Sequence, residues 1–248
     1  MTIKIGDLFK LGSHRLLCGD AEKPEHFDIL MQDQKATMVF TDPPYNVNYS
    51  PRTGKLRNQR DTTRPIINDD LCDRCFDTMI TKSVANLMEY AKGAFYICMG
   101  HNELPRLMRI FKEKGGTIST LLIAAKSHFS LSWAHYHPKH ELILYGWNDK
   151  PHWCGSRKEH TLLEFKVSNR NLHPTMKPVA LIEKTIQNSS QIGDSVLDCF
   201  AGSGSTLIAA HNQNRVCYAM EIAPGYCQLI FDRFYEHTGI KPEKVNPT

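Results

Sequence analysis

The sequence has no apolar run long enough to cross a bilayer, so we expect no membrane-spanning helix. Its first residues, Met1 to Asp7, lack the apolar core and the small-residue cleavage site of a secretory signal peptide. We find neither an internal repeat nor a low-complexity tract. From these absences we expect a cytoplasmic protein.

Strong charge of either sign is also absent. The formal net charge is +4 with 12 histidines, and 41% hydrophobic and 23% charged residues are ordinary values for a globular chain. This mild basicity permits a polyanionic partner without demonstrating one. A chain of 248 residues has room for one large core, and we expect a single domain over residues 1–248.

A second cysteine pair is missing as well. The chain has 8 cysteines, but only Cys72 and Cys75 have the CxxC spacing. A structural zinc site would need another such pair at a suitable distance, so we expect no metal site. In a chain of this size we interpret the cysteines as reduced thiols, most of them small core residues.

The chain alternates between strand-like and helix-like stretches. Strands are expected at 15–18, 36–40, 94–99, 118–124, 141–145, 195–198 and 216–220, and helices at 24–31, 76–90, 104–114, 178–188, 206–211 and 224–237. Such alternation predicts an α/β fold with a mostly parallel, twisted sheet covered by helices on both faces. Because no helix separates 118–124 from 141–145, these two strands predict an antiparallel hairpin at one edge.

An acidic residue, two prolines and an aromatic residue follow the apolar run at 38–40, as Asp42, Pro43, Pro44 and Tyr45. Ligands of open α/β sheets bind beyond the carboxyl ends of strands. The exocyclic amine of a nucleobase is a weak nucleophile because its lone pair is delocalised into the ring. Asp42 and the Pro43 carbonyl can accept its N–H groups, and Tyr45 can stack on the base. This tetrad therefore indicates methyl transfer to a nucleobase amine, which must first leave the duplex stack.

A tight turn after a strand is the alternative interpretation of the tetrad, and a second motif argues against it. Between Asp198 and Thr206, two glycines let the backbone approach a ligand closely. A dinucleotide fingerprint would need Gly or Ala at Leu207, and Asp198 would repel a pyrophosphate but suits an ammonium. Glu221 ends the next expected strand, where an acid bonds ribose hydroxyls. A ribose and an ammonium without phosphates describe S-adenosyl-L-methionine.

Four segments in this order resemble the DNA amino-methyltransferases of the β class, of phage and bacterial type. They are Cys18-Gly19-Asp20, the tetrad, His173-Pro174-Thr175-Met176-Lys177-Pro178 and the loop from Asp198. The resemblance spans about His14 to Phe234 and implies the Rossmann-like methyltransferase fold. It also implies DNA as partner, S-adenosyl-L-methionine as cofactor and a homodimer as an expected assembly.

The resemblance assigns roles to individual residues. The catalytic residues would be Asp42, Pro43, Pro44 and Tyr45. Glu221 would hold the ribose of the cofactor, Asp20 would lie near its adenine, and Thr175 and Lys177 would close its methionine end. The full set of expected cofactor-binding residues is Asp20, Asp42, Thr175, Lys177, Asp198, Phe200, Gly202, Gly204, Ser205 and Glu221.

Asp at the first position of the tetrad usually accompanies adenine N6 in this family, whereas Ser accompanies cytosine N4. Asp42 therefore favours adenine, and N4-cytosine methylation is the enzymatic alternative. A non-catalytic module that binds DNA or the cofactor is the alternative of another class. The intact tetrad argues against it, since a binding module has no need of Asp42.

Two polar, basic stretches are candidates for contact with DNA phosphates, at 50–70 and in a short target-recognition insertion at 147–172. Solvated surface loops are the alternative for both. The candidate residues are Arg52, Lys55, Arg57, Arg60, Arg64, Arg157, Lys158 and Arg170. The segment His135-Tyr136-His137 with His140-Glu141 resembles one in phage-type members, and its spacing is not that of a zinc helix.

Overall fold

The computed structural model describes residues 2–47, 66–129, 135–165 and 176–245. Its strands are β1 (Leu8–Leu11), β2 (His14–Cys18), β3 (Ala36–Thr41), β4 (Ala91–Met99), β5 (Thr117–Ala125), β6 (His140–Trp147), β7 (Leu162–Glu164), β8 (Ser195–Asp198), β9 (Val216–Glu221) and β10 (Glu243–Val245). They form one 10-stranded sheet in the order β10-β1-β2-β9-β8-β3-β4-β6-β5-β7.

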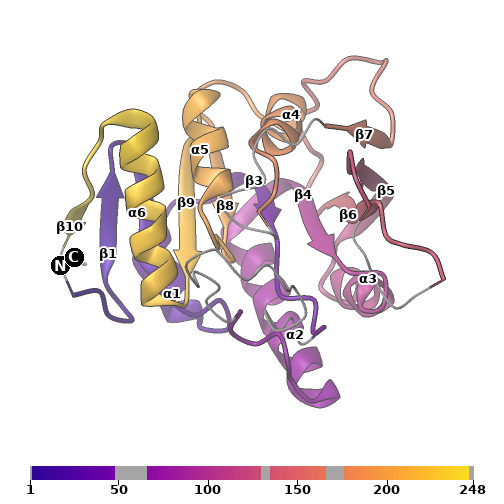
Figure 1. The fold of residues 1–248 in the computed structure, drawn as a ribbon, viewed down its shortest axis with the longest axis horizontal. Coiled ribbons are helices and arrows are strands. Elements are labelled where there is room, and N and C mark those ends of the chain that lie inside the picture. The colour runs from indigo at the N-terminus through magenta and orange to yellow at the C-terminus, as the bar shows by residue number, and fades with distance from the viewer. Residues whose placement is uncertain (1, 48–65, 130–134, 166–175, 246–248) are drawn as a thin grey trace.

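The helices lie in two layers, one on each face of this sheet (Figure 1). They are α1 (Pro24–Met31), α2 (Asp73–Tyr90), α3 (Leu104–Glu113), α4 (Val179–Ser189), α5 (Ser205–Asn212) and α6 (Pro224–Thr238). Helices α4, α5 and α6 pack apolar residues such as Ile186, Leu207 and Phe234 into one core. Helices α1, α2 and α3 form the core of the opposite face. A proline in the first turn starts α1, α3 and α6, where its missing N–H costs no helical hydrogen bond.

The centre of the sheet is parallel, which decides where the strands end. β2, β9, β8, β3 and β4 are parallel neighbours, so their carboxyl ends lie at one end of the sheet, here called the carboxyl end. β6 runs antiparallel to β4 and pairs Leu142 with Met99, so the first residues of β6 also lie at the carboxyl end. Loops from widely separated parts of the chain therefore meet there.

The α/β architecture and the strands and helices expected from the sequence are confirmed, and three strands were not expected. β1, β7 and β10 contain only three or four residues, which is too short to show a clear apolar period. The expected hairpin of β5 and β6 forms, but β7 pairs outside β5, so the hairpin itself is not the edge of the sheet.

One expectation about the cysteines is wrong. The structure joins Cys72 and Cys75 in a disulfide at the start of α2, because the two side chains lie on the same exposed first turn. The six other cysteines are free, and all of them except Cys154 are buried, as expected of small core residues. Within the described part of the chain, no helix has the length and apolar character needed to span a bilayer.

Candidate active site

The acidic residues singled out in the sequence meet at the carboxyl end of the sheet. β2 pairs Cys18 with Glu221, the last residue of β9, so Asp20 and Glu221 lie at the ends of neighbouring strands. Asp198 ends β8, and Asp42 follows β3 in the adjacent position. A parallel sheet collects the ends of its strands on one side, and this brings together the tetrad and the glycine loop although about 150 residues separate them.

Asp42, Tyr45 and Lys177 form a compact cluster. The Nζ atom of Lys177 lies 2.6 Å from Asp42 Oδ2, and the Tyr45 hydroxyl donates to Asp42 Oδ1 at 2.7 Å. Lys177 also donates to the Tyr45 hydroxyl at 3.2 Å and lies 5.4 Å from the centre of its ring. Asp42 therefore has one donor on each carboxylate oxygen. Lys177 was expected at the methionine end of the cofactor, and the structure places its ammonium on the tetrad.

A second carboxylate, which the sequence did not assign to the site, completes this cluster. Glu141 Oε2 lies 2.8 Å from Lys177 Nζ, and Glu141 Oε1 lies 2.7 Å from Lys126 Nζ. Glu141 comes from the start of the antiparallel strand β6, and Lys126 directly follows β5. The only sequence signal was the acid at 141 beside a segment already singled out for its histidines, and its partner could not be known without the strand register.

The charges of this cluster shift the pKa values of its members, and they favour the ionised forms of Lys177 and Glu141. Burial by itself would lower the pKa of Lys177, but the Asp42 and Glu141 carboxylates keep it well above its usual value. Burial alone would raise the pKa of Glu141, and the two lysine ammonium groups instead lower it to about 2. Burial raises the pKa of Asp42 in spite of its contact with Lys177. Of the two carboxylates, Asp42 and Glu141, Asp42 thus has the greater affinity for a proton.

The backbone after the tetrad is tied to the segment that precedes α2. The Asp69 carboxylate accepts hydrogen bonds from the N–H groups of Tyr45 and Val47, at 3.2 and 3.3 Å. Asn46 and Leu71 exchange two hydrogen bonds of 2.7 and 3.1 Å. These contacts hold the Tyr45 ring in place. A Cβ atom at Gly100, the residue after β4, would come within 3.3 Å of that ring, so glycine leaves room for it.

The loop between β8 and α5 is shaped by its two glycines and by Glu221. Gly202 and Gly204 have positive φ angles of 52° and 80°, which side chains disfavour. Glu221 accepts hydrogen bonds from the N–H groups of Gly202, at 2.8 Å, and Ala223, at 2.9 Å. Burial raises the pKa of Glu221 to about 7 against these two donors. Glu221 therefore braces the loop and retains lone pairs for a ligand.

Asp198 lies deeper than the sequence suggested. Its side chain is buried, and its Oδ1 atom accepts hydrogen bonds from the Thr41 hydroxyl at 2.8 Å and from the Phe200 N–H at 3.1 Å. Burial raises the pKa of Asp198 to about 6, against hydrogen bonds from Thr206 and Thr41 that lower it. Asp198 thus connects the glycine loop to the strand that leads into the tetrad.

The glycine loop has the features expected of a site for a small polar cofactor. The Ser205 hydroxyl at the start of α5 is buried and has no hydrogen-bond partner among the described residues. A Cβ atom added at Gly202 would meet only one atom within 4 Å, the Phe200 carbonyl oxygen at 4.0 Å, so this face of the loop is open. Asp20 lies across the strand ends, and its Oδ1 atom accepts from the N–H of Glu22 at 2.9 Å. An unpaired hydroxyl, an open glycine and two carboxylates fit a ribose and an ammonium.

Several predicted residues lie outside the described ranges. These are Thr175 of the cofactor set and Arg52, Lys55, Arg57, Arg60, Arg64 and Arg170 of the DNA set. No group of three or more metal-ligating side chains is placed to hold an ion in residues 2–47, 66–129, 135–165 and 176–245.

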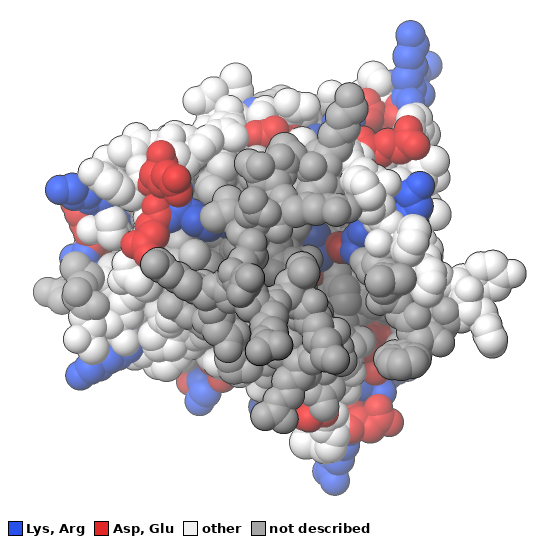
Figure 2. All heavy atoms as spheres, viewed as in Figure 1, with Lys and Arg blue, Asp and Glu red and all other residues white. Residues whose placement is uncertain are grey.

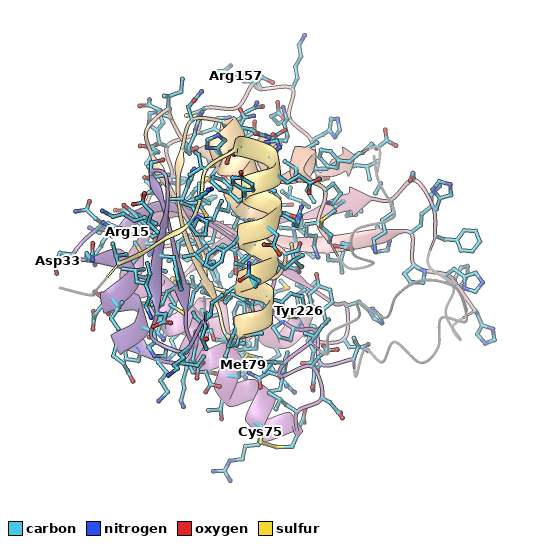
Figure 3. All side chains as sticks on the ribbon, turned by 60° about the vertical axis from the view of Figure 1, so that its left-hand side comes forward. Arg15, Asp33, Cys75, Met79, Arg157 and Tyr226 are labelled. Atoms are coloured by element: carbon cyan, nitrogen blue, oxygen red, sulfur yellow. A yellow bond between two sulfur atoms is a disulfide. The ribbon has the colours of Figure 1, made fainter. Side chains whose placement is uncertain are left out.

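The structure does not bring Arg157 and Lys158 to the tetrad. Their segment packs along the carboxyl-terminal half of α4, where Cys154 N donates to Asn188 O at 2.8 Å, whereas Lys177 precedes the start of that helix. Cys75 lies in the first turn of α2, and in Figure 3 Arg157 lies at the opposite end of the molecule from it. On the face drawn in Figure 2, the lysines and arginines of the described residues are interspersed with acids rather than gathered in one patch.

Comparison with known proteins places this arrangement among DNA-modifying enzymes. A family model described as "DNA methylase" matches residues 36–232. YubD of Escherichia coli (strain K12) is 28% identical over 189 residues, which cover 76% of this chain and 77% of YubD. Type II methyltransferase M2.MboI of Moraxella bovis is 22% identical over 229 residues, 84% of each chain.

Solved structures of similar fold include one named as a complex with SAM and one named for its target base. The M1.HpyAVI–SAM complex superposes with a TM-score of 0.65 at 22% identity, covering 88% of this chain and 97% of the other. The PvuII DNA methyltransferase, named as cytosine-N4-specific, gives a TM-score of 0.68 at 15% identity, with 91% and 86% covered. At such identities the likeness concerns the fold.

Proposed function

Because this chain belongs to the N6/N4 DNA methylase family, whose model matches residues 36–232, we propose that it methylates the N6 amine of adenine in DNA. S-adenosyl-L-methionine is the methyl donor of a DNA methylase of this kind and supplies a sulfonium-bound methyl group. One observation carries the proposal: the Asp42 tetrad and the open glycine loop lie side by side at the carboxyl end of the sheet. A methyl donor held by the loop would face an amine held by the tetrad.

Asp42 is the residue that would act on the amine. Its oxygens already accept from Lys177 and the Tyr45 hydroxyl, and each carboxylate oxygen has a further lone pair for an N–H of the base. As nitrogen takes the methyl group it gains positive charge, and a fixed carboxylate stabilises that charge. Because burial raises the pKa of Asp42, this side chain is also a suitable acceptor for the proton that nitrogen then releases.

The second carboxylate keeps the cluster suited to a developing cation. A lone lysine beside Asp42 would cancel its negative charge and would repel a positively charged nitrogen. Glu141 shares the Lys177 ammonium, so this lysine is not the counter-ion of Asp42 alone. Lys126 balances the far side of Glu141, where its side chain is 34% exposed. We therefore assign Glu141 a positioning role at this site.

The residue at position 42 supports adenine as the target base. An Asp in the first position of the tetrad favours adenine N6, as the family resemblance implies. N4-cytosine methylation is the second candidate, because the PvuII enzyme of similar fold is named as cytosine-N4-specific. The family resemblance also favours a homodimer, which sedimentation of the protein with and without DNA would detect.

Mass spectrometry of methylated nucleosides tests the proposal. DNA is incubated with the protein and isotopically labelled S-adenosyl-L-methionine, digested and analysed. Labelled N6-methyladenine is the expected product, and Asp42→Asn is the matched control, in which much less of it should form. Labelled N4-methylcytosine would correct the base but retain the activity. Label in neither base on genomic DNA of varied sequence, with the cofactor bound, would contradict DNA methylation.

A further inference from the structure

An exposed basic and aromatic segment projects between β5 and β6. We call residues 126–129 and 135–140 the β5–β6 arm. The sequence from 126 to 140 contains no acid, and its described basic and aromatic residues are Lys126, His128, Phe129, His135, Tyr136, His137, Lys139 and His140. At the right of Figure 3, ring side chains extend from the ribbon into solvent in this region. The arm is thus unlike the mixed-charge surface elsewhere.

The aromatic rings of the arm are held at the surface rather than in a core. Tyr136 is 92% exposed and Phe129 is 55% exposed. Phe129 stacks on the His137 ring, with centroids 5.2 Å apart and planes inclined by 13°. Below this stack, Lys126 N donates to Lys139 O at 2.8 Å and closes the hairpin. Residues 126–129 and 135–140 are therefore joined to each other, and Tyr136 points into solvent from this hairpin.

The base of the arm is part of the proposed active site. Lys126 lies 2.7 Å from Glu141, which lies 2.8 Å from Lys177, which lies 2.6 Å from Asp42. Tyr136 is five residues from Glu141, so it reaches at most about 17 Å beyond it even when the chain is fully extended. That span is comparable with a DNA major groove, about 12 Å wide. A duplex positioned with its target base at Asp42 would lie beside the arm.

From this juxtaposition we propose that the β5–β6 arm binds the DNA around the target nucleotide, with the Tyr136 ring stacking on a base and Lys139 contacting phosphate. Aromatic rings stack on any base, and cations beside them bind the backbone. Extruding the target base leaves a gap in the stack that an inserted ring can fill. A protein partner is less well matched, since lysines flank the rings of the arm and the segment from 126 to 140 offers no acid. This inference rests on DNA being the substrate.

Tyr136→Ala in the full chain tests this role. Binding to a duplex oligonucleotide that wild type methylates is measured by fluorescence anisotropy with bound cofactor, beside KM for DNA, kcat and the dissociation constant of S-adenosyl-L-methionine. We expect about a tenfold weaker DNA affinity with unchanged cofactor affinity, because one base–ring stack is lost. Tyr136→Phe keeps the ring and is expected to bind as wild type does. Tyr235→Ala, at a tyrosine 48% exposed on α6, is the control for losing a surface ring.

A second variant tests the phosphate contact. Affinity falls as salt rises, and Lys139→Ala is expected to make the slope of log affinity against log salt less steep by about one unit. The reason is that one phosphate contact releases about one counterion. Tyr136→Ala, in contrast, is expected to leave that slope nearly unchanged.

The outcomes separate this inference from the function on which it rests. If wild type methylates DNA and Tyr136→Ala binds it within twofold of wild type, the arm is not a DNA contact and the function stands. A change of oligomeric state in place of DNA affinity would make the arm a contact between subunits and overturn the inference. If wild type binds DNA without methylating it and Tyr136→Ala binds more weakly, the inference stands and the proposed function fails.

Discussion

Lys177 Nζ lies 2.6 Å from Asp42 Oδ2 and, on its other side, 2.8 Å from Glu141. One buried ammonium, with a side chain only 8% exposed, therefore serves two carboxylates. This arrangement fixes the orientation of Asp42, and Glu141 keeps Lys177 from acting as the counter-ion of Asp42 alone. The same ammonium would otherwise neutralise the acid that is proposed to stabilise the reacting amine.

Replacing Asp42 tests the catalytic assignment. Asp42→Asn preserves the shape of the side chain but removes its negative charge, and we expect kcat to fall by a factor of about 10²–10³, as when an oriented charge-stabilising group is lost. The dissociation constant of S-adenosyl-L-methionine, measured by calorimetry, should change little. Methyl transfer at the wild-type rate in Asp42→Asn would remove Asp42 from the mechanism.

Replacing Glu141 tests the shared ammonium. Glu141→Gln leaves Lys177 with one carboxylate, and we expect kcat to fall while KM for the cofactor stays nearly constant. We also expect the free energy of unfolding in urea to fall by about 2 kcal/mol, less than the roughly 3–5 kcal/mol of a fully buried broken pair, because the Glu141 side chain is 21% exposed.

Glu113→Gln is the matched control for this variant. Its ion pair with Arg109, at 2.8 Å, lies on the exposed face of α3, so its loss should change stability far less than Glu141→Gln does. Glu141→Asp provides a partial rescue, since it restores the charge on a shorter side chain. If Glu141→Gln lost stability while kcat remained at the wild-type value, Glu141 would be a structural residue only.

Substitutions in the glycine loop test the cofactor site. Gly204→Ala introduces a Cβ atom at a φ of 80° and 3.1 Å from Ile230, so we expect the loop to shift and the cofactor to bind at least about tenfold more weakly. Gly239→Ala is the control, because Gly239 also has a positive φ, 74°, but ends α6 with nothing within 4 Å of the added atom. It should cost about 1 kcal/mol of stability and leave cofactor affinity unchanged. Equal losses of affinity in both variants would show a general effect of destabilisation.

Stability should depend on pH through His14. Its ring is buried between β2 and α5, where Nδ1 accepts the Cys217 N–H at 3.0 Å and Nε2 lies 3.2 Å from His211 Nδ1. Burial, and to a lesser extent His211, lowers the pKa of His14 from 6.5 to about 4. The unfolded chain then binds a proton that the folded chain rejects, so this contribution is fully present above pH 6.5 and is lost as the pH falls toward 4.

Urea unfolding between pH 7.5 and 4 measures this effect. We expect wild type to lose about 3 kcal/mol over that interval through His14, in addition to the losses of its carboxylates. His14→Gln should be less stable at pH 7.5 but should show a flatter profile. His101→Asn, at an exposed histidine, should follow wild type. Parallel profiles for wild type and His14→Gln would contradict the assignment.

The fold could be predicted wherever the signal was local. Apolar runs with prolines at helix starts placed the central strands and the helices close to their observed bounds, because each such element carries its own period. The three short strands carried too few residues for a period. β10 exists because it pairs with β1, with Leu8 opposite Val245, and no local pattern specifies a partner so far along the chain.

The site divides along the same line. The tetrad and the glycine loop are each one unbroken stretch of sequence, and their residue types indicate their chemistry. The tetrad has an acid and an aromatic ring after a strand, and the loop has glycines between an acid and a helix. By themselves these residues determined the class of reaction and the cofactor. The role of Glu141 depends on the register of an antiparallel strand. The sequence alone does not show which groups this carboxylate contacts.

The contact between Lys177 and Asp42 joins residues 135 positions apart, and only the tertiary structure could decide it. Sequence alone determined which chemical groups this protein possesses and which strand ends carry them, because strand, turn and helix propensities act over a few residues. The tertiary structure decided which charged side chains form ion pairs, since the energy of an ion pair depends on separation and burial rather than on position in the chain.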